Sequence, residues 1–225
     1  TNTSPFRVGG KKIAIETAVK KMLADIYTPV GIYLRLRDRF RDTVLLESTD
    51  SHAAENSYSF IGINAIAGIE IKDKNVVEFK LPNQPAERVA LKKNDDLKEI
   101  LWQFTQQFEA SSTDLKAARF AQGLYGYFTY DTVQFFETIQ LNKKGDDSNT
   151  IPVARYRLYQ YVIAINHHKD ELVLCENKLQ GVDSEIALLE SLINSKDVPV
   201  YPFRLKGKEI SNLTDEAYIE MVKKG

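Results

Sequence analysis

The single cysteine and the adjacent histidines carry the most reactive side chains in the sequence. Cys175 lies in the alternating run Glu171–Cys175, where strand packing accounts for it, and one cysteine cannot form an internal disulfide. His167 and His168 stand in a segment that we interpret as a strand-connecting turn, and no third ligand stands at metal-binding spacing. We therefore expect a packed thiol and solvated imidazoles, with no catalytic residue and no metal ligand in this chain.

A carboxylate and a hydroxyl end the apolar run that begins at Thr43. Leu45 and Leu46 are followed directly by Glu47 and Ser48. Taken alone, this pattern favours a short buried strand in which Glu47 is the first solvated residue and Ser48 caps a turn. The loop that follows is expected over residues 49–56.

Basic residues and glycines form two further patterns. Arg35, Arg37, Arg39 and Arg41 crowd the end of a predicted helix, where the helix dipole favours cations, so a solvated helix end is expected. The alternative is that these arginines form a binding site for a carboxylate or a partner subunit. The glycines of the segment 123–128 permit close backbone packing under an aromatic strand, but two glycines three residues apart do not make a phosphate loop.

The elements that position these residues alternate between helical and strand periodicity, which predicts an α+β fold with antiparallel sheets packed by helices. Thr28-Pro29 is a typical helix start, and it begins a helix predicted over 28–40. Apolar residues recur at helical spacing over 95–109 and 184–193, and Thr214 begins a last helix. Strands are predicted over 43–48, 58–63, 65–71, 76–81, 119–130, 153–165 and 171–176, with turns at 62–64, 72–75 and 167–170, a short helix over 131–137 and a surface loop over 141–150.

Composition excludes several classes of protein. The 225 residues include 43% hydrophobic and 27% charged residues, which is ordinary for a globular protein of one or two domains. With 30 basic and 31 acidic side chains the net charge is −1, so nucleic acid is not an expected partner. Neither a membrane-spanning run nor the apolar stretch of a signal peptide is present, so no membrane association and a cytoplasmic location are expected.

Five segments in order resemble the amino-terminal region of anthranilate synthase component I. They are residues 28–34, 45–48, 58–62, 123–131 and 211–218, so the resemblance covers about residues 22–225. The resemblance implies a parent enzyme, a lyase, that makes anthranilate and pyruvate from chorismate in tryptophan biosynthesis. It also implies Mg²⁺ and a glutamine amidotransferase partner subunit, with the catalytic and metal-binding residues beyond the end of this sequence, so this segment alone is expected to hold no cofactor and to be inactive.

In that family the amino-terminal domain is associated with feedback inhibition by tryptophan. The matching positions are Leu46, Glu47, Ser48, Tyr58 and Ser59. Recognition of a free amino acid needs an acceptor for the ammonium, donors for the carboxylate and an apolar slot for the ring, and these side chains supply such groups. Asn56-Ser57 stand where many relatives place a basic residue before the tyrosine.

The resemblance divides the chain into residues 1–198, a regulatory domain, and residues 199–225, a linker with the start of the catalytic domain. Two alternatives stay open. Aminodeoxychorismate synthase component I shares much of the pattern, and a free-standing small-molecule-binding module is a different class. The amphipathic helix at 214–225, which has no sequence left to pack against, argues against the free-standing module.

Overall fold

The computed structural model describes residues 6, 11–47, 57–73, 76–91, 96–139, 151–197, 199–208 and 210–224. The fold is α+β, as predicted. Its strands are β1 (Ile13–Leu23), β2 (Val44–Leu46), β3 (Tyr58–Asp73), β4 (Val76–Lys80), β5 (Glu87–Ala90), β6 (Phe108–Ser111), β7 (Tyr125–Phe128), β8 (Ala154–Asn166) and β9 (Glu171–Lys178). Its helices are α1 (Pro29–Leu36), α2 (Asp96–Thr105), α3 (Leu115–Ala118), the 3₁₀ helix η1 (Tyr130–Phe135), α4 (Ile186–Ile193) and α5 (Asp215–Lys224).

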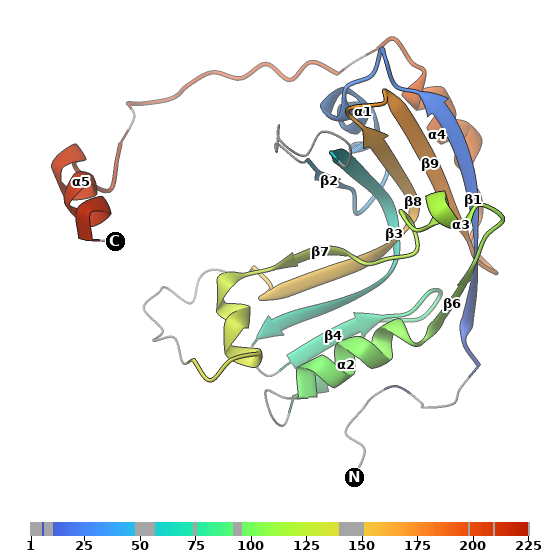
Figure 1. Ribbon diagram of the computed structural model, residues 1–225, viewed down its shortest axis with the longest axis horizontal. Coiled ribbons are helices and arrows are strands. Elements are labelled where there is room, and N and C mark those ends of the chain that lie inside the picture. Colours follow the sequence, from blue (N-terminus) through green and yellow to red (C-terminus); the bar gives the residue numbers. More distant parts are fainter. Residues whose placement is uncertain are drawn as a thin grey trace.

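The nine strands form one sharply bent sheet in the order β5-β4-β3-β8-β9-β1-β6, with β2 added to β3 and β7 added to β8 (Figure 1). Neighbouring strands are antiparallel except for β1 and β6, which are parallel. The long strands β3 and β8 run through the bend, so each half of the sheet contains part of both. This continuity makes the two halves one folding unit.

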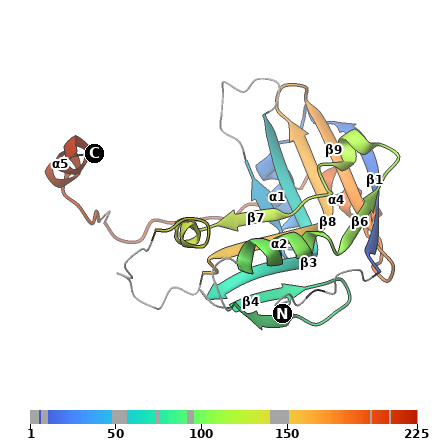
Figure 2. The same ribbon diagram turned by 60° about the horizontal axis from the view of Figure 1, so that its bottom comes forward.

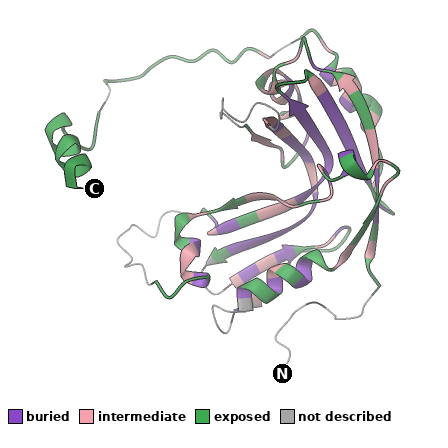
Figure 3. Cartoon of the chain, in the orientation of Figure 1, coloured by how far each residue is buried: buried purple, intermediate pink, exposed green. Residues whose placement is uncertain are grey.

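Three apolar clusters fill the space between the sheet and its helices. One half of the sheet packs on α2, through Leu97, Ile100 and Phe104 (Figure 2). The other half is covered on one face by α1 and α4 and on the opposite face by α3. The central strands are correspondingly buried, whereas α5 has no buried residue and lies apart at the end of an extended segment (Figure 3).

Several predicted boundaries are confirmed by local chemistry. The hydroxyl of Thr28 accepts a hydrogen bond from the Gly31 amide at 3.0 Å and Pro29 is the first helical residue, as expected of a helix start. Thr214 likewise accepts from the Ala217 amide at 3.2 Å at the start of α5. The hairpin around residues 167–170 is also present, between β8 and β9.

The predicted turn at 62–64 is wrong. Residues 58–73 form one strand, and Asn64 adopts a φ of 56° beside a register shift between Ala65 and Ala67. The polar residue therefore marks a β-bulge that bends the strand and does not reverse it. A single asparagine produces the same local signal in either case, because both a turn and a bulge use its tolerance of positive φ.

Other boundaries shift by a few residues or were missed. The helix predicted over 95–109 ends at Thr105 because Phe108 begins β6, and the helix predicted to reach residue 40 ends at Leu36. The strand predicted over 119–130 is confined to β7, since α3 and a turn precede it. Strands β1, β5 and β6 and helix α3 were not predicted. The predicted loops at 49–56 and 141–150 lie outside the described residues.

Candidate functional site

The predicted effector residues lie where β2 ends and β3 begins. Leu46 is paired with Phe60, so the chain leaves β2 beside the first residues of β3. Leu46 is half-buried, whereas Glu47 is exposed and makes no ion pair or hydrogen bond with any residue that the structure describes. Ser48 lies outside the described residues. A free carboxylate at this position is an acceptor available to a cationic ligand group.

Tyr58 belongs to a cluster of aromatic rings on the concave face of the sheet. Its ring centroid lies 5.9 Å from that of Phe60 and 5.1 Å from that of Phe120, and Phe60 in turn contacts Tyr125 at 5.6 Å. The cluster ends at Tyr159, whose pKa burial raises to about 12. Tyr58 is thus half-buried in a packed aromatic layer, and a ligand at the end of β2 would meet the edge of that layer.

Ser59 is fully buried and faces away from Tyr58, because successive side chains of a strand alternate between the two faces. Its Oγ lies 2.8 Å from Nε2 of His167, in the turn between β8 and β9. The structure therefore brings Leu46, Glu47 and Tyr58 to one region, while the Ser59 hydroxyl is already engaged. His167 is exposed, as expected, but it is tied to β3 by this hydrogen bond.

Sequence reasoning missed Asn166, the partner of Tyr58 across the β3–β8 ladder. Its Oδ1 accepts hydrogen bonds from the amides of His168 and Lys169, both at 2.9 Å, which fixes the orientation of the side-chain amide. Its Nδ2 is buried and has no acceptor among the described residues. No local signal marks this residue, since its position beside Tyr58 depends on pairing across more than a hundred residues.

A buried ion cluster occupies the concave face of the other half of the sheet. Glu70, only 5% exposed, forms an ion pair with Nε of Arg155 at 3.0 Å and accepts a hydrogen bond from Nη2 of Arg157. Burial lowers the pKa of the Arg157 guanidinium, and the nearby Asp42 carboxylate opposes that effect. Because Glu70 lies between two cations on neighbouring strand positions, the cluster has a structural role in holding β3 to β8.

Cys175 is a packing residue, in agreement with the sequence analysis. It is fully buried against α3, its Sγ lies 3.6 Å from the Ala117 carbonyl oxygen, and burial raises its pKa to about 12. A thiol that stays protonated is a poor nucleophile. Nothing in this environment activates it for catalysis.

Two arginines at the end of α1 contact the chain's own carboxyl-terminal segment. Arg35 donates to the backbone carbonyls of Asp197 and Ile193 at 3.3 and 3.5 Å. The Arg37 guanidinium lies 4.4 Å from the ring centroid of Tyr201, whose hydroxyl is hydrogen-bonded to Asp38. The two arginines therefore hold the segment that leaves α4, a use of these cations that neither sequence interpretation anticipated.

Residues 67–225 match the protein family described as chorismate binding enzyme, so this chain belongs to that family. The curated relatives that it resembles are named anthranilate synthase component 1. The Lactococcus lactis protein is 27% identical over 180 residues, covering 77% of this chain and 35% of the relative. The Aquifex aeolicus protein is 28% identical, with 62% of this chain and 26% of the relative covered, and the Mycobacterium tuberculosis H37Rv protein is 26% identical, with 83% and 36% covered.

This chain therefore spans about a third of the length of the curated relatives that it matches. Among solved structures, anthranilate synthase component I from Streptococcus pneumoniae TIGR4 aligns with 77% of this chain and 35% of its own, at 20% identity and a TM-score of 0.37. No helix in the described part of the chain is long and apolar enough to cross a membrane.

Proposed function

We propose that this chain is the amino-terminal, non-catalytic part of an anthranilate synthase component I. The observation that carries the proposal is its membership of the chorismate binding family, together with relatives of that name, of which it spans about a third. In this proposal residues 1–198 form the regulatory domain and residues 199–225 form the linker and the start of the catalytic domain. The parent enzyme acts in the cytoplasm.

The proposed parent is a lyase that converts chorismate to anthranilate and pyruvate, using Mg²⁺ and ammonia from a glutamine amidotransferase subunit. The described residues of this chain do not suit the metal, because no three carboxylate, imidazole or thiol groups among them converge. We therefore assign no step of the reaction to this segment and place the chemistry in the rest of the parent.

The proposed role of the segment is to supply half of a feedback site for tryptophan. Glu47 supports this role, because its carboxylate is exposed at the end of β2 and free to accept from the ammonium of an amino acid. Leu46 and the edge of the Tyr58 ring supply apolar surface beside it. Ser48 and the backbone near Ser59 are the proposed hydrogen-bonding groups, and the rest of the parent completes the enclosure.

A tryptophan dose response on the full-length parent tests the feedback site. Glu47→Ala should raise the tryptophan concentration for half-inhibition roughly ten- to a hundred-fold, because a charge-assisted hydrogen bond contributes about 1.5–3 kcal/mol. Ser48→Ala should act in the same direction but more weakly. Turnover without tryptophan should stay close to wild type in both.

Glu109→Ala is the matched control, because Glu109 is an exposed carboxylate of β6, far along the sheet from β2. It should leave the inhibition curve unchanged. Wild-type inhibition in both Glu47→Ala and Ser48→Ala would contradict the feedback site. The two residues would then have only structural roles, Glu47 at the end of a strand and Ser48 at the start of a turn.

The isolated chain tests the assignment of the chemistry. Mixed with chorismate, Mg²⁺ and ammonia, it should produce no anthranilate fluorescence. Turnover above a protein-free blank would show that catalytic residues lie within these 225 positions and would overturn the division proposed here.

A further inference from the structure

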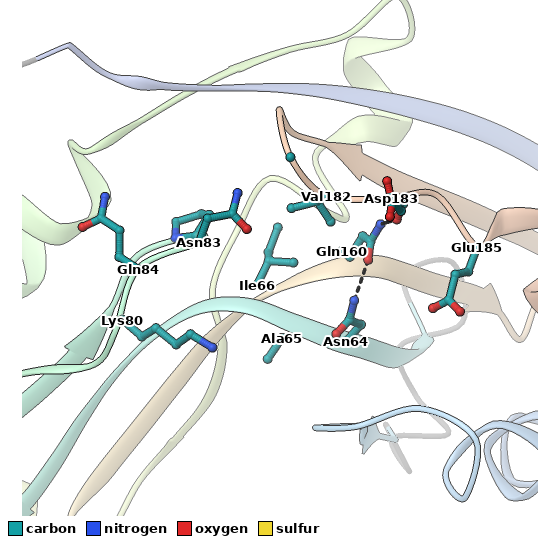
Figure 4. Close-up of a pocket in the computed structure, with 12 residues that line it drawn as sticks. Asn64, Ala65, Ile66, Lys80, Asn83, Gln84, Gln160, Val182, Asp183 and Glu185 are labelled. Atoms are coloured by element: carbon teal, nitrogen blue, oxygen red, sulfur yellow. Dashed lines mark hydrogen bonds between the residues drawn. The ribbon is translucent and has the colours of Figure 1, made fainter.

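A hollow of about 620 Å³ opens beside the bulge of β3, between the stretch that pairs with β2 and the stretch that pairs with β4 (Figure 4). It is bounded by Asn64, Ala65 and Ile66 of β3, by the turn after β4, by Gln160 of β8 and by residues 181–185 before α4. Its volume lies within the range of small-molecule sites. None of the proposed feedback residues that the structure describes lines it.

The polar groups that shape this hollow are fixed by hydrogen bonds. Asn64 Nδ2 donates to Gln160 Oε1 at 2.6 Å, and the buried Gln160 donates through Nε2 to the Asp183 carbonyl at 2.7 Å. Asn83 donates through Nδ2 to the Gln180 carbonyl at 3.1 Å, which ties the turn after β4 to the turn after β9.

Asn64 and Asn83 both have a positive φ, 56° and 58°. Asparagine tolerates this conformation, so both residues fix local bends of the backbone at the rim of the hollow. The hydrogen bonds of Asn64 with Gln160 and of Asn83 with the Gln180 carbonyl join segments about a hundred residues apart, so the wall of the hollow is preorganised.

Charges of opposite sign stand at the two ends of the hollow. The Lys80 side chain enters from β4, and the Asp183 and Glu185 side chains lie toward the other end (Figure 4). None of these three makes an ion pair or side-chain hydrogen bond with a described residue. Ile66 and Val182 supply apolar surface between the ends.

The separation of these charges follows from the strand register. Lys80 is paired with Gly68, whereas the Glu185 amide donates to the hydroxyl of Tyr161, which is paired with Ile63. Lys80 and Glu185 are therefore anchored on opposite sides of the β3 bulge. The hollow of about 620 Å³ between them has room for a ligand of a few extended residues.

We propose that this hollow binds a short extended zwitterion, of the size and chemistry of a free tripeptide. Its ammonium lies at Asp183 and Glu185 and its carboxylate at Lys80, with an apolar middle on Ile66 and Val182. A single α-amino acid carries both charges on one carbon and cannot reach both ends, whereas three extended residues span about 10 Å. This site is separate from the feedback site and does not depend on it.

Binding of the tripeptide Ala-Val-Ala to the 225-residue chain, followed by NMR titration, tests the proposal. The free peptide should shift amide resonances of residues 64–66, 80–84 and 181–185. The N-acetylated peptide and the C-terminal amide, each lacking one charge, should each bind about three- to five-fold more weakly, which is the range of an exposed charge pair.

Charge variants then assign each end of the peptide. Lys80→Met should weaken binding of the free peptide but should not weaken binding of the C-terminal amide any further. The double variant Asp183→Asn/Glu185→Gln should weaken binding of the free peptide but should not weaken binding of the N-acetylated peptide any further. Lys116→Met and Glu109→Gln are matched controls, because both residues are exposed and neither lines the hollow.

Absence of binding at 10 mM peptide would overturn the proposal. Equal affinities for the free and both capped peptides would overturn it as well, because the charges would then contribute nothing. Affinities for the Lys80 and Asp183/Glu185 variants equal to those of the control variants would show that the peptide binds elsewhere. All of these substitutions are at the surface, and circular dichroism verifies that each variant is folded.

Discussion

Gly126 is expected to be one of the least replaceable residues of the sheet, although it is half-buried and carries no side chain. In the β7–β8 ladder it lies opposite Tyr156, and a Cβ atom added to it would stand 2.7 Å from the Arg155 carbonyl carbon and 2.8 Å from Cα of Tyr156. Carbon atoms normally approach to about 3.5–4.0 Å. The obstructing atoms are backbone, so Gly126→Ala must push β7 about 1 Å away from β8.

The cost follows from what holds β7 in place. A displacement of that size breaks two or more ladder hydrogen bonds, each with a net contribution of about 1 kcal/mol. It also disturbs the contact between Phe128 and Tyr156, whose centroids are 4.8 Å apart and which contributes about 0.5–1.5 kcal/mol. Gly126→Ala should therefore destabilise the protein by about 3 kcal/mol and lower Tm by roughly 6–12 °C in a chain of this size.

Gly123→Ala is the matched control, three residues away in the same segment. An added Cβ there meets no atom within 4 Å, so the change should alter stability by about 0.5 kcal/mol or less. Urea unfolding and thermal melts followed by circular dichroism measure both variants. A Gly126→Ala variant whose Tm lies within about 2 °C of that of the unsubstituted chain would refute the close-approach argument. An equal loss of stability in Gly123→Ala would refute it as well.

Two other perturbations should act through buried groups. Glu70→Ala leaves Arg155 and the largely buried Arg157 without their shared carboxylate, so it should destabilise by about 3–5 kcal/mol. Glu78→Ala removes two more exposed ion pairs, with Lys72 and Arg88, and should cost about 1 kcal/mol. Equal urea midpoints for the two variants would contradict this. Burial raises the pKa of Cys175 from 9.0 to about 12 in the folded state, so the thiol of the unfolded chain ionises first as the pH rises. The stability contributed by the neutral thiol is therefore intact below pH 9 and is lost as the pH rises toward 12. Cys175→Ala should show a shallower loss of stability over that pH window than the unsubstituted chain. In the unsubstituted chain, a thiol reagent at pH 8 should react with Cys175 only after denaturation.

The sequence predicts the elements of this fold best where the signal is local. Thr28 and Pro29 define the start of α1, because capping depends on a few consecutive residues. The hairpin formed by β8 and β9 is equally clear, since both strands are long and apolar and the turn between them is polar. By contrast, β1 alternates weakly between apolar and charged residues, and β6 has four residues, so neither shows a pattern that separates it from a loop.

The candidate sites were predictable only in part, because they depend on distant pairings. Glu47 follows from a motif, and the structure shows that its side chain is exposed at the end of β2, while its role stays a prediction. The orientation of Ser59 away from Tyr58 follows from strand alternation, which the motif does not encode. Asn166 beside Tyr58, and Glu70 between two arginines, arise from the pairing of β3 with β8, which no single segment reveals.

The strand order also bears on how a ribosome-bound chain acquires this sheet. β1 pairs with β9, which is synthesised roughly 150 residues later, or about 8 to 30 seconds at 5–20 residues per second. Its other neighbour, β6, covers only residues 13–16 of its length. During that interval residues 17–23 of β1, including Val19, lack their final partners. The nascent chain therefore presents an unsatisfied strand edge of the kind that chaperones bind and that promotes aggregation when they are absent.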